Sequence, residues 1–501
     1  MANDTLDQRQ KKTPFFTAMW NYVQSNPAPF DVPGHKMGNY HTDLSDFAGS
    51  MIYKLDINAP LGLDNLYHST GVIKESEELC AECFHAEKCL FSVNGTSGGI
   101  LTMLVGILKQ NDKIILPRNV HKSIINGLIL SGAVPIFVTP DYDLETGIAN
   151  GVPFENYKKA IDEHLEAKAV FVINPTYFGI ASDLVKIVNY AHEHDMIVIA
   201  DEAHGSHLYF SDKLPMAAMD AGADCSALSL HKTAGSLTQS SIILYNTKRI
   251  DEFALKKAFA MFSSTSPNHL LLASIDVTRK KLYFEGEKLM DDVLYLSKYA
   301  RTKLHQIKGI KVYDKSYCTK DGRNDIDLTK LMIKVTGLGL SGFEVYRMLK
   351  NEFNVQLELA EVGLVLCIIS LGSTKEHIDR LVEGLKTLSA RYYAIKKSKN
   401  VPKFKYSQPP LLCTPNQAFH APKKLVDLKD SIGEICSESL MVYPPGIPLA
   451  IPGEMITSQA VSLIEFYQNQ GGVLLSDSPE GKVLVIDRNE WYLESEINYD
   501  Y

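Results

Sequence analysis

The sequence contains no apolar run long enough to cross a membrane. Its most apolar windows, such as residues 124–136, are interrupted by Asn, Gly, Ser and Pro, whereas a membrane-spanning helix needs about 20 predominantly apolar residues. The opening stretch, MANDTLDQRQKKTPFF, has no apolar core of the kind found in a secretory signal peptide. We therefore expect a cytoplasmic protein.

Cysteine is scarce, with eight residues in 501, which is too few for a disulfide scaffold. Cys80 and Cys83 have the CxxC spacing of some metal and redox sites, but no second CxxC is present to complete a zinc site. The surrounding stretch KESEELCAECFHAEKC predicts a helix with Leu79 and Cys83 on one face. We interpret the pair as structural and expect no metal.

An excess of positive charge is also missing, since 51 Lys and Arg stand against 59 Asp and Glu. This balance argues against nucleic acid as the main partner, because phosphate binding needs a concentrated basic surface. The short basic run of Lys396, Lys397 and Lys399 is interpreted as a solvated linker. No repeat and no low-complexity tract stands out.

The length, 501 residues, predicts two to four domains at roughly 150 residues each. From about residue 85, short apolar runs alternate with helix-like stretches such as 100–109 and 183–194. Most runs are apolar on both sides, which is typical of buried strands in a parallel sheet, and the βαβ pattern predicts a doubly wound α/β fold. The last strand follows its predecessor too closely for a crossover helix and is expected to be antiparallel. The seven predicted strands are 89–93, 113–116, 134–138, 169–173, 197–200, 226–230 and 241–245.

A second α/β pattern follows a long helical region at 270–307. It comprises predicted strands at 329–335, 355–358 and 364–369 and predicted helices at 342–351 and 375–394. The remainder contains YPPGIP (443–448) and IPGE (451–454), whose Pro and Gly content predicts irregular backbone. We divide the chain into an N-terminal helical segment (1–30), a large cofactor-binding domain (31–300), a small α/β domain (301–398) and a C-terminal α+β domain (399–501).

Polar clusters follow four predicted strands, and ligands bind at the carboxyl ends of such strands. In the first cluster, NGTSGG (94–99), small residues let backbone amides approach a phosphate, and the following helix adds positive potential at its N-terminus. Thr and Ser are also ordinary helix caps, and neither GxGxxG nor a Walker lysine is present. In the second cluster His121 could stack on an aromatic cofactor, although taken alone it is more typical of a solvated loop histidine.

The third cluster contains Asp201, which at a buried strand end needs a cationic or hydrogen-bonded partner. A protonated pyridine nitrogen is such a partner and would make the ring an electron sink. Metal ligation by Asp201, His204 and His207 is the alternative, without a strict ligand motif. The fourth cluster contains Lys232, whose partial burial would favour a Schiff base. The order of the four clusters predicts a pyridoxal 5′-phosphate (PLP) site.

The chain resembles the fold-type-I PLP enzymes of the prokaryotic ornithine/lysine/arginine decarboxylase family. The matching stretches span residues 30–454 in the family's order, and SLHKTAGSLTQ and YPPGIP…IPGE are the specific ones. The greatest similarity is to the short biosynthetic arginine decarboxylase branch, which lacks the N-terminal wing domain of the long inducible enzymes. The matching stretches are FDVPGHKMG, SVNGTSGG, PRNVHKS, INPTYFG, DEAHG, SLHKTAGSLTQSS, FSSTSP and VYPPGIPLAIPGE.

The resemblance implies a role for each motif residue. Thr96 and Ser97 bind the cofactor phosphate, and Lys232 forms the Schiff base. His121 stacks on the pyridine ring and Asp201 pairs with its nitrogen. The implied catalytic set is completed by His231, which with Lys232 is a candidate to return the proton to Cα. Further implied contacts are Ala203, His204 and Ser229 at the cofactor, Thr265 and Ser266 at the phosphate of the neighbouring subunit in a homodimer, and His35, Lys36 and Glu454 at the substrate entrance.

One departure concerns the residues after Asp201. The long inducible enzymes have Ser-Ala-Trp there, whereas this chain has Glu202, Ala203 and His204. The difference favours the short branch, and it weakens any transfer of substrate from the inducible enzymes.

The resemblance implies decarboxylation of arginine to agmatine and CO₂ in polyamine synthesis. Arginine, lysine and ornithine all end in a cation, and a planar guanidinium suits a bidentate carboxylate. Glu454 is the first candidate for that carboxylate, with Asp64 and Glu361 behind it. Lysine or ornithine decarboxylation stays open, as does a PLP aminotransferase or carbon–sulfur lyase, which would leave YPPGIP unexplained. An inactive regulatory homologue is disfavoured because Lys232, Asp201 and His121 are all present.

Overall fold

The structure is a computed structural model that describes residues 6–395, 408–443 and 447–491. The chain divides into two compact units, the first comprising Met1–Ile107, Ile197–Asp292 and Ser370–Gly372, and the second comprising Leu108–Met196, Val293–Ile369 and Ser373–Tyr501. The four-domain division stays a prediction, and the predicted linker lysines at 396–399 lie outside the described residues. Among the described helices, none is long and apolar enough to span a membrane.

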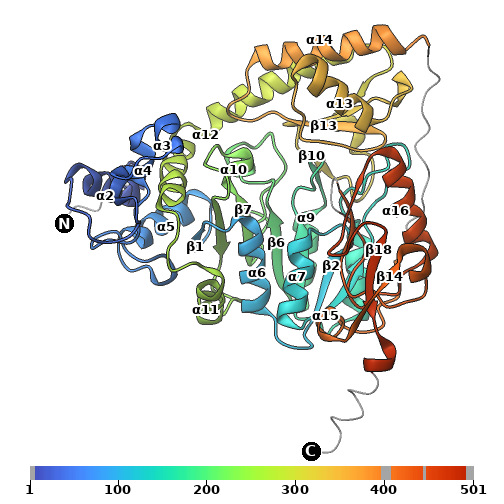
Figure 1. Cartoon of the computed structure of the whole chain (residues 1–501), viewed down its shortest axis with the longest axis horizontal. Coiled ribbons are helices and arrows are strands. Elements are labelled where there is room, and N and C mark those ends of the chain that lie inside the picture. The colour runs from blue at the N-terminus through green and yellow to red at the C-terminus, as the bar shows by residue number, and fades with distance from the viewer. Residues whose placement is uncertain (1–5, 396–407, 444–446, 492–501) are drawn as a thin grey trace, which may run out of the picture. The chain divides into compact units, whose positions relative to one another are not determined.

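All seven predicted strands are present in one sheet, in the order β1-β8-β7-β6-β4-β2-β3 (Figure 1). β6 pairs with β7 in parallel, and β2 pairs in parallel with β3 and β4. β8 is antiparallel to β1 and β7, which confirms the prediction from the short connection. Every residue of β6, β7 and β8 is buried, which explains their two-sided apolar sequences. The bounds are β1 (Lys88–Ser92), β2 (Lys113–Pro117), β3 (Val134–Val138), β4 (Ala169–Ile173), β6 (Ile197–Glu202), β7 (Cys225–Ser229) and β8 (Ser241–Tyr245).

Helix α6 (Gly95–Ile107) lies against β7 and β8 and begins earlier than its apolar pattern predicts (Figure 1). The expected start near Ile100 is wrong, because the glycine cluster itself is helical. A Cβ on Gly99 would lie 3.2 Å from the Cβ of Ala227, so this glycine allows the helix to pack closely on β7. Thr96 and Ser97 therefore occupy the first turn of a helix.

Along the chain, the remaining helices of the first unit precede β1, connect β7 to β8 or follow β8. Helix α5 confirms the helix predicted around the CxxC, and Cys80 and Cys83 are buried on it. Burial raises the pKa of the Cys83 thiol, so it is a structural side chain. The bounds are α1 (Leu6–Gln10), α2 (Pro14–Gln24), α3 (Asp43–Ala48), α4 (Ser50–Leu55), α5 (Val72–Cys83), α10 (Leu230–Thr233), α11 (Glu252–Phe262) and α12 (His269–Leu304), which continues into the second unit.

The second unit contains a four-stranded antiparallel sheet in the order β12-β13-β11-β9. The strand predicted at 355–358 is wrong, since β12 begins at Leu359. Asn354 has a φ of 51° at the end of α13, and the Val355 N–H still bonds to the Leu349 carbonyl. The residues directly after the helix therefore belong to its cap, and strand pairing with β13 begins only at Leu359. The bounds are β9 (Lys311–Val312), β11 (Lys330–Lys334), β12 (Leu359–Ala360) and β13 (Leu364–Ile368), with a separate pair β5 (Ile180–Ala181) and β10 (Asp325–Ile326). The helices are α7 (Lys122–Ser131), α8 (Phe154–Glu163), α9 (Leu184–Glu193), α13 (Gly342–Phe353), α14 (Lys375–Tyr392), α15 (Pro415–His420) and α16 (Ser458–Gln470).

The C-terminal segment (described residues 408–443 and 447–491) forms two small sheets around a buried apolar cluster that includes Leu440, Ile456 and Ile464. The irregular backbone predicted for the Pro-rich stretch is wrong for β16, where Pro448 sits on an edge strand that tolerates the missing N–H. Residues 444–446 lie outside the described residues. The strands are β14 (Lys423–Asp427), β15 (Leu440–Tyr443), β16 (Ile447–Ala450), β17 (Val473–Leu475) and β18 (Lys482–Ile486).

Candidate active site

A cluster of buried hydroxyl groups lies at the N-terminus of α6. Thr96 Oγ1 is 2.5 Å from Ser229 Oγ and 3.3 Å from Ser241 Oγ. Thr96 and Ser229, both predicted at the phosphate, are thus brought together, with the exposed Ser97 next in the helix. Hydroxyl groups at the positive end of a 13-residue helix suit an anionic group such as a phosphate. The sequence analysis missed Ser241, which lies opposite Ser229 in the β7–β8 ladder.

Asp201 and Glu202 end β6 and face opposite sides of the sheet, as adjacent strand residues do. Asp201 is 6% exposed and accepts a hydrogen bond from the Ala203 N–H at 3.0 Å. Glu202 has no exposed surface and accepts from Tyr209 OH, Ser226 Oγ and the Ala218 N–H at 2.6–2.8 Å. Glu202 is therefore a structural anchor that sequence reasoning missed, while Asp201 lies among the last buried strand residues before the loop, and its pairing with a ring nitrogen stays a prediction.

Lys232 lies on the short helix α10, half-buried, with its Nζ 3.1 Å from His204 Nε2. The structure therefore places these two predicted site residues in direct contact. The ring of His231 donates from Nδ1 to the Ser240 carbonyl at 3.0 Å. Burial lowers the pKa of His231, and the neighbouring Lys232 lowers it further against the effect of that hydrogen bond. The His231 imidazole is therefore mainly neutral at pH 7.

Four further predicted residues lie in the first unit but take no part in these contacts. His35 Nε2 is 3.1 Å from Asp56 Oδ2, and Lys36 Nζ donates to the Asp31 carbonyl. Thr265 and Ser266 are exposed, and Ser266 Oγ accepts from Asn58 at 3.4 Å. Their roles at the substrate entrance and in a neighbouring subunit stay predictions.

The other two predicted site residues, His121 and Glu454, belong to the second unit. His121 is exposed at the N-cap of α7, where its Nδ1 accepts from the Ser123 N–H at 3.2 Å. Glu454 has no exposed surface, and both of its carboxylate oxygens accept from Arg118 at 2.8 Å. Its carboxylate is thus engaged within the chain, and its role in binding the substrate cation stays a prediction.

Asp64, a weaker candidate for the cation-binding carboxylate, caps the turn that precedes α5. Its oxygens accept from the N–H groups of Thr70, Gly71 and Ile73. Burial raises the pKa of Asp64, but these backbone hydrogen bonds outweigh burial and hold the pKa below its usual value. The carboxylate therefore has a local structural function.

Glu361, the other weaker candidate, is buried with 5% of its surface exposed, and it accepts a long hydrogen bond from the Val362 N–H at 3.4 Å. Burial raises its pKa to about 8. In the folded protein the Glu361 carboxyl therefore keeps its proton up to about pH 8. In the unfolded chain it loses that proton near the ordinary glutamate pKa of about 4.3. Folding stability should fall as the pH rises from the unfolded pKa through about 8.

We expect Glu361→Gln to stabilise the protein above about pH 8 by on the order of 1–3 kcal/mol, because the amide removes a buried charge. Near pH 5 the variant should match the parent. Denaturant unfolding at both pH values measures the difference, with the 83%-exposed Glu376 changed to Gln as the matched control. An equal difference in unfolding free energy between variant and parent at both pH values would contradict the raised pKa of Glu361.

Comparison with known proteins decides the family. A family model described as "Orn/Lys/Arg decarboxylase, major domain" matches residues 13–377, and one described as "Orn/Lys/Arg decarboxylase, C-terminal domain" matches residues 403–471. This chain belongs to the Orn/Lys/Arg decarboxylase family. The resemblance inferred from the sequence motifs is thereby confirmed.

Individual relatives of this Orn/Lys/Arg decarboxylase family member cover nearly its whole length. The arginine decarboxylase of Bacillus subtilis (strain 168) is 41% identical over 477 residues, which are 95% of this chain and 97% of that protein. The arginine decarboxylase of Halalkalibacterium halodurans is 40% identical, covering 94% of this chain and 96% of that protein. The solved Francisella novicida lysine decarboxylase LdcF shares the fold with a TM-score of 0.83 at 20% identity, covering 96% of this chain and 82% of that one.

As an Orn/Lys/Arg decarboxylase family member, the protein is a PLP-dependent decarboxylase of a basic amino acid. The PLP fold-type-I class predicted from the sequence is confirmed, and the aminotransferase and carbon–sulfur lyase alternatives fall away. The residues present fit the cofactor. The buried hydroxyls at the N-terminus of α6 suit its phosphate, and the strand-end Asp201 and half-buried Lys232 suit its ring nitrogen and aldehyde.

Proposed function

We propose that this protein decarboxylates arginine, producing agmatine and CO₂ for polyamine synthesis. The observation that carries the proposal is the similarity over nearly the whole chain to two proteins named arginine decarboxylase. The family alone leaves lysine and ornithine open. A cytoplasmic location, expected from the sequence, stays a prediction.

When bound, PLP supplies a ring that delocalises the negative charge left on the substrate when CO₂ departs. In this proposal Lys232 attaches the cofactor through its Nζ, and Asp201 holds the proton on the pyridine nitrogen. Thr96 and Ser97 bind the phosphate with their hydroxyls, beside Ser229. The other residues with proposed contacts are His121 on the ring face and Ala203, His204 and His231 beside the cofactor.

The chain's own side chains also handle the proton that must reach the substrate Cα. Lys232 Nζ is the proposed donor, and its contact with His204 Nε2 at 3.1 Å keeps the amine at a fixed place. His231 is the second candidate, but the single proton of its neutral ring is engaged by Nδ1 with the Ser240 carbonyl, so its Nε2 would first have to take up a proton. His35, Lys36 and Glu454 are proposed at the substrate entrance.

We also propose a homodimer in which Thr265 and Ser266 reach the phosphate site of the second copy. Large apolar side chains in residues 30–61 of the first unit are exposed, with Phe30 at 95%, Phe47 at 91% and Leu61 at 103%. We propose that these side chains lie in the dimer interface, because a contiguous exposed apolar patch marks an interaction site. Sedimentation should give an even multiple of 55.8 kDa, and a single-chain mass at micromolar concentration would contradict the dimer.

Turnover of single substrates tests the arginine assignment. The protein with PLP is given arginine, lysine and ornithine separately, and the amine formed in each reaction is identified by mass. We expect agmatine from arginine at a kcat/KM far above that of the other two reactions. Dominant cadaverine or putrescine would reject arginine and keep the family reaction. No amine from any of the three would reject the proposed function.

A further inference from the structure

Arg118 and Glu454 form a fully buried ion pair between residues 336 positions apart. Two parallel hydrogen bonds of 2.8 Å join the guanidinium to the carboxylate, and neither residue has exposed surface. The guanidinium also lies 4.8 Å from the ring centroid of Phe137, and the Ile451 N–H donates to Glu454 Oε2 at 3.0 Å. Such a pair adds little net stability because both charges lose water. Its geometry nevertheless fixes the relative position of the two segments that carry it.

One of those segments is the loop that carries His121. Arg118 directly follows β2, and its backbone N–H donates to the Val138 carbonyl at 3.0 Å at the end of β3. Val120 is 1% exposed, and His121 caps α7 two residues before Ser123. The loop between β2 and α7 is thus only four residues long, so a shift of Arg118 is passed on to His121.

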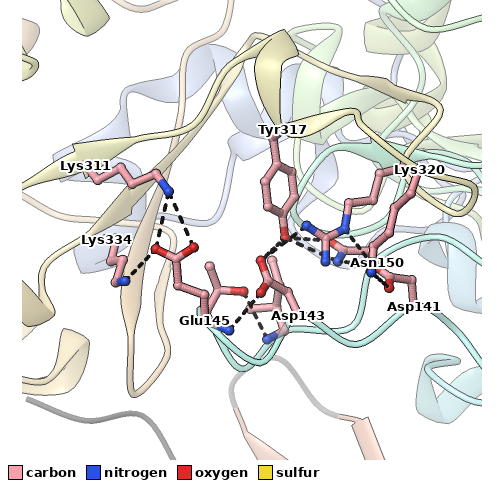
Figure 2. A network of polar contacts seen from close by, with 11 residues as sticks. Asp141, Asp143, Glu145, Asn150, Lys311, Tyr317, Lys320 and Lys334 are labelled. Carbon is pink, nitrogen blue, oxygen red and sulfur yellow. Dashed lines mark hydrogen bonds and ion pairs between the residues drawn. The ribbon is translucent and has the colours of Figure 1, made fainter. Parts of the chain in front are cut away.

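A second contact ties the same loop to Asn150, which belongs to the polar network of the second unit that Figure 2 shows. The Asn119 side chain donates to the Asn150 carbonyl at 3.3 Å. The Asn150 amide donates to Asp141 at 2.9 Å and lies 3.2 Å from Tyr317 OH, which in turn donates to Asp143 at 2.5 Å. Asn119 is therefore hydrogen-bonded to a residue, Asn150, whose own side chain is held by Asp141 and Tyr317.

The segment around Glu454 is equally constrained. The Cys436 N–H donates to the Glu454 carbonyl and the Gly453 N–H to the Cys436 carbonyl, both at 2.8 Å. Gly453 has a φ of 91°, and a Cβ there would lie 2.2 Å from the Cys413 carbonyl, so only glycine allows this turn. Helix α15 packs on α7, where Asn416 donates to the Ile129 carbonyl at 2.7 Å. The C-terminal segment thus offers the His121 loop a rigid support.

We infer that Glu454 is a positioning residue, which through Arg118 sets the place of the His121 ring in the cofactor site. The C-terminal segment thereby contributes to cofactor binding without contacting the cofactor. This inference rests on the proposed function, because it takes the His121 ring as a cofactor contact.

Glu454→Gln tests the inference, because the amide fills the same space but cannot form the same paired ionic contact. We expect the dissociation constant of PLP from the apoprotein to rise roughly 10-fold, by analogy with the loss of metal affinity when a group that orients a metal-ligating histidine is removed. The matched control is Asp276→Asn, which weakens the buried Asp276–Arg279 pair of the first unit (2.8 Å, both unexposed). The control should lower stability and leave the PLP dissociation constant unchanged.

A double-variant cycle separates positioning from general damage. In a His121→Ala background, Glu454→Gln should add little to the PLP dissociation constant, because the ring that it positions is gone. A full additive effect there, or an equal loss of PLP affinity in Asp276→Asn, would overturn the inference. Unchanged PLP affinity and absorption spectrum in His121→Ala alone would show instead that the proposed role of His121 is wrong, and the inference would fall with it.

A second variant avoids placing an unpaired charge in the core, should Glu454→Gln fold poorly. Asn119→Ala removes the 3.3 Å hydrogen bond to the Asn150 carbonyl. We expect PLP affinity to change in the same direction as in Glu454→Gln, again only when His121 is present. Wild-type PLP affinity in both variants would overturn the inference.

Discussion

Lys232→Ala should lower arginine turnover by about 10³-fold or more, because it removes the amine that attaches the cofactor. Lys232 is half-buried and its Nζ contacts His204, whereas alanine provides no amine. The visible absorbance of the bound cofactor should disappear with the activity. Agmatine formation at saturating arginine and excess PLP measures the loss.

The matched control for this variant is Lys213→Ala in the same unit, since Lys213 is exposed and pairs with Asp291 on the surface. Turnover by the control should stay within about twofold of the parent, because an exposed ion pair contributes little. Unfolding curves for both variants show whether the fold is kept. A well-folded Lys232→Ala protein that retains a tenth of the parent's turnover would contradict the assignment.

Asp201→Asn should lower kcat by about 10²- to 10³-fold with little change in KM. The carboxylate stabilises a proton on the pyridine nitrogen, whereas a neutral amide does not, so the ring withdraws electrons less strongly. Steady-state kinetics with arginine separate the two constants. A rise in KM at constant kcat would indicate that Asp201 only helps to bind the substrate.

Glu202→Gln is the matched control, because the neighbouring carboxylate faces the opposite side of β6. Tyr209 OH, Ser226 Oγ and the Ala218 N–H all donate to the Glu202 carboxylate and tie it to the surrounding core. We expect a loss of stability on the order of 1–3 kcal/mol and a nearly unchanged kcat for the folded fraction. Equal losses of kcat in both variants would remove the distinction between the two faces.

Much of the sheet and of its cofactor cluster could be predicted from local sequence. The two-sided apolar runs predicted seven strands because both faces of this sheet are buried. Polar residues at strand ends gather along one edge, so the pattern predicted the strand-end place of Asp201, whereas the closeness of Thr96 and Ser229 was implied by the family resemblance. The antiparallel β8 followed from the short connection after β7.

The remainder depends on tertiary contacts that no local pattern records. The sequence offers Glu454 as an acidic residue in an apolar turn, but its partner Arg118 lies 336 residues away. Likewise, the glycine cluster was expected to be a loop, and close packing of Gly99 against Ala227 makes it helical. The left-handed Asn354 ends α13 in a cap where the Val355 N–H still bonds back to the Leu349 carbonyl, and β12 begins only at Leu359.

The central claim is that Lys232 carries the cofactor, and borohydride reduction of the purified holoenzyme tests it most directly. Reduction fixes an imine-linked cofactor to its amine, and mass spectrometry of the digested protein then identifies the modified peptide. The account predicts one reduced phosphopyridoxyl group, located on Lys232. The same group on another lysine, with Lys232 unmodified, would contradict it.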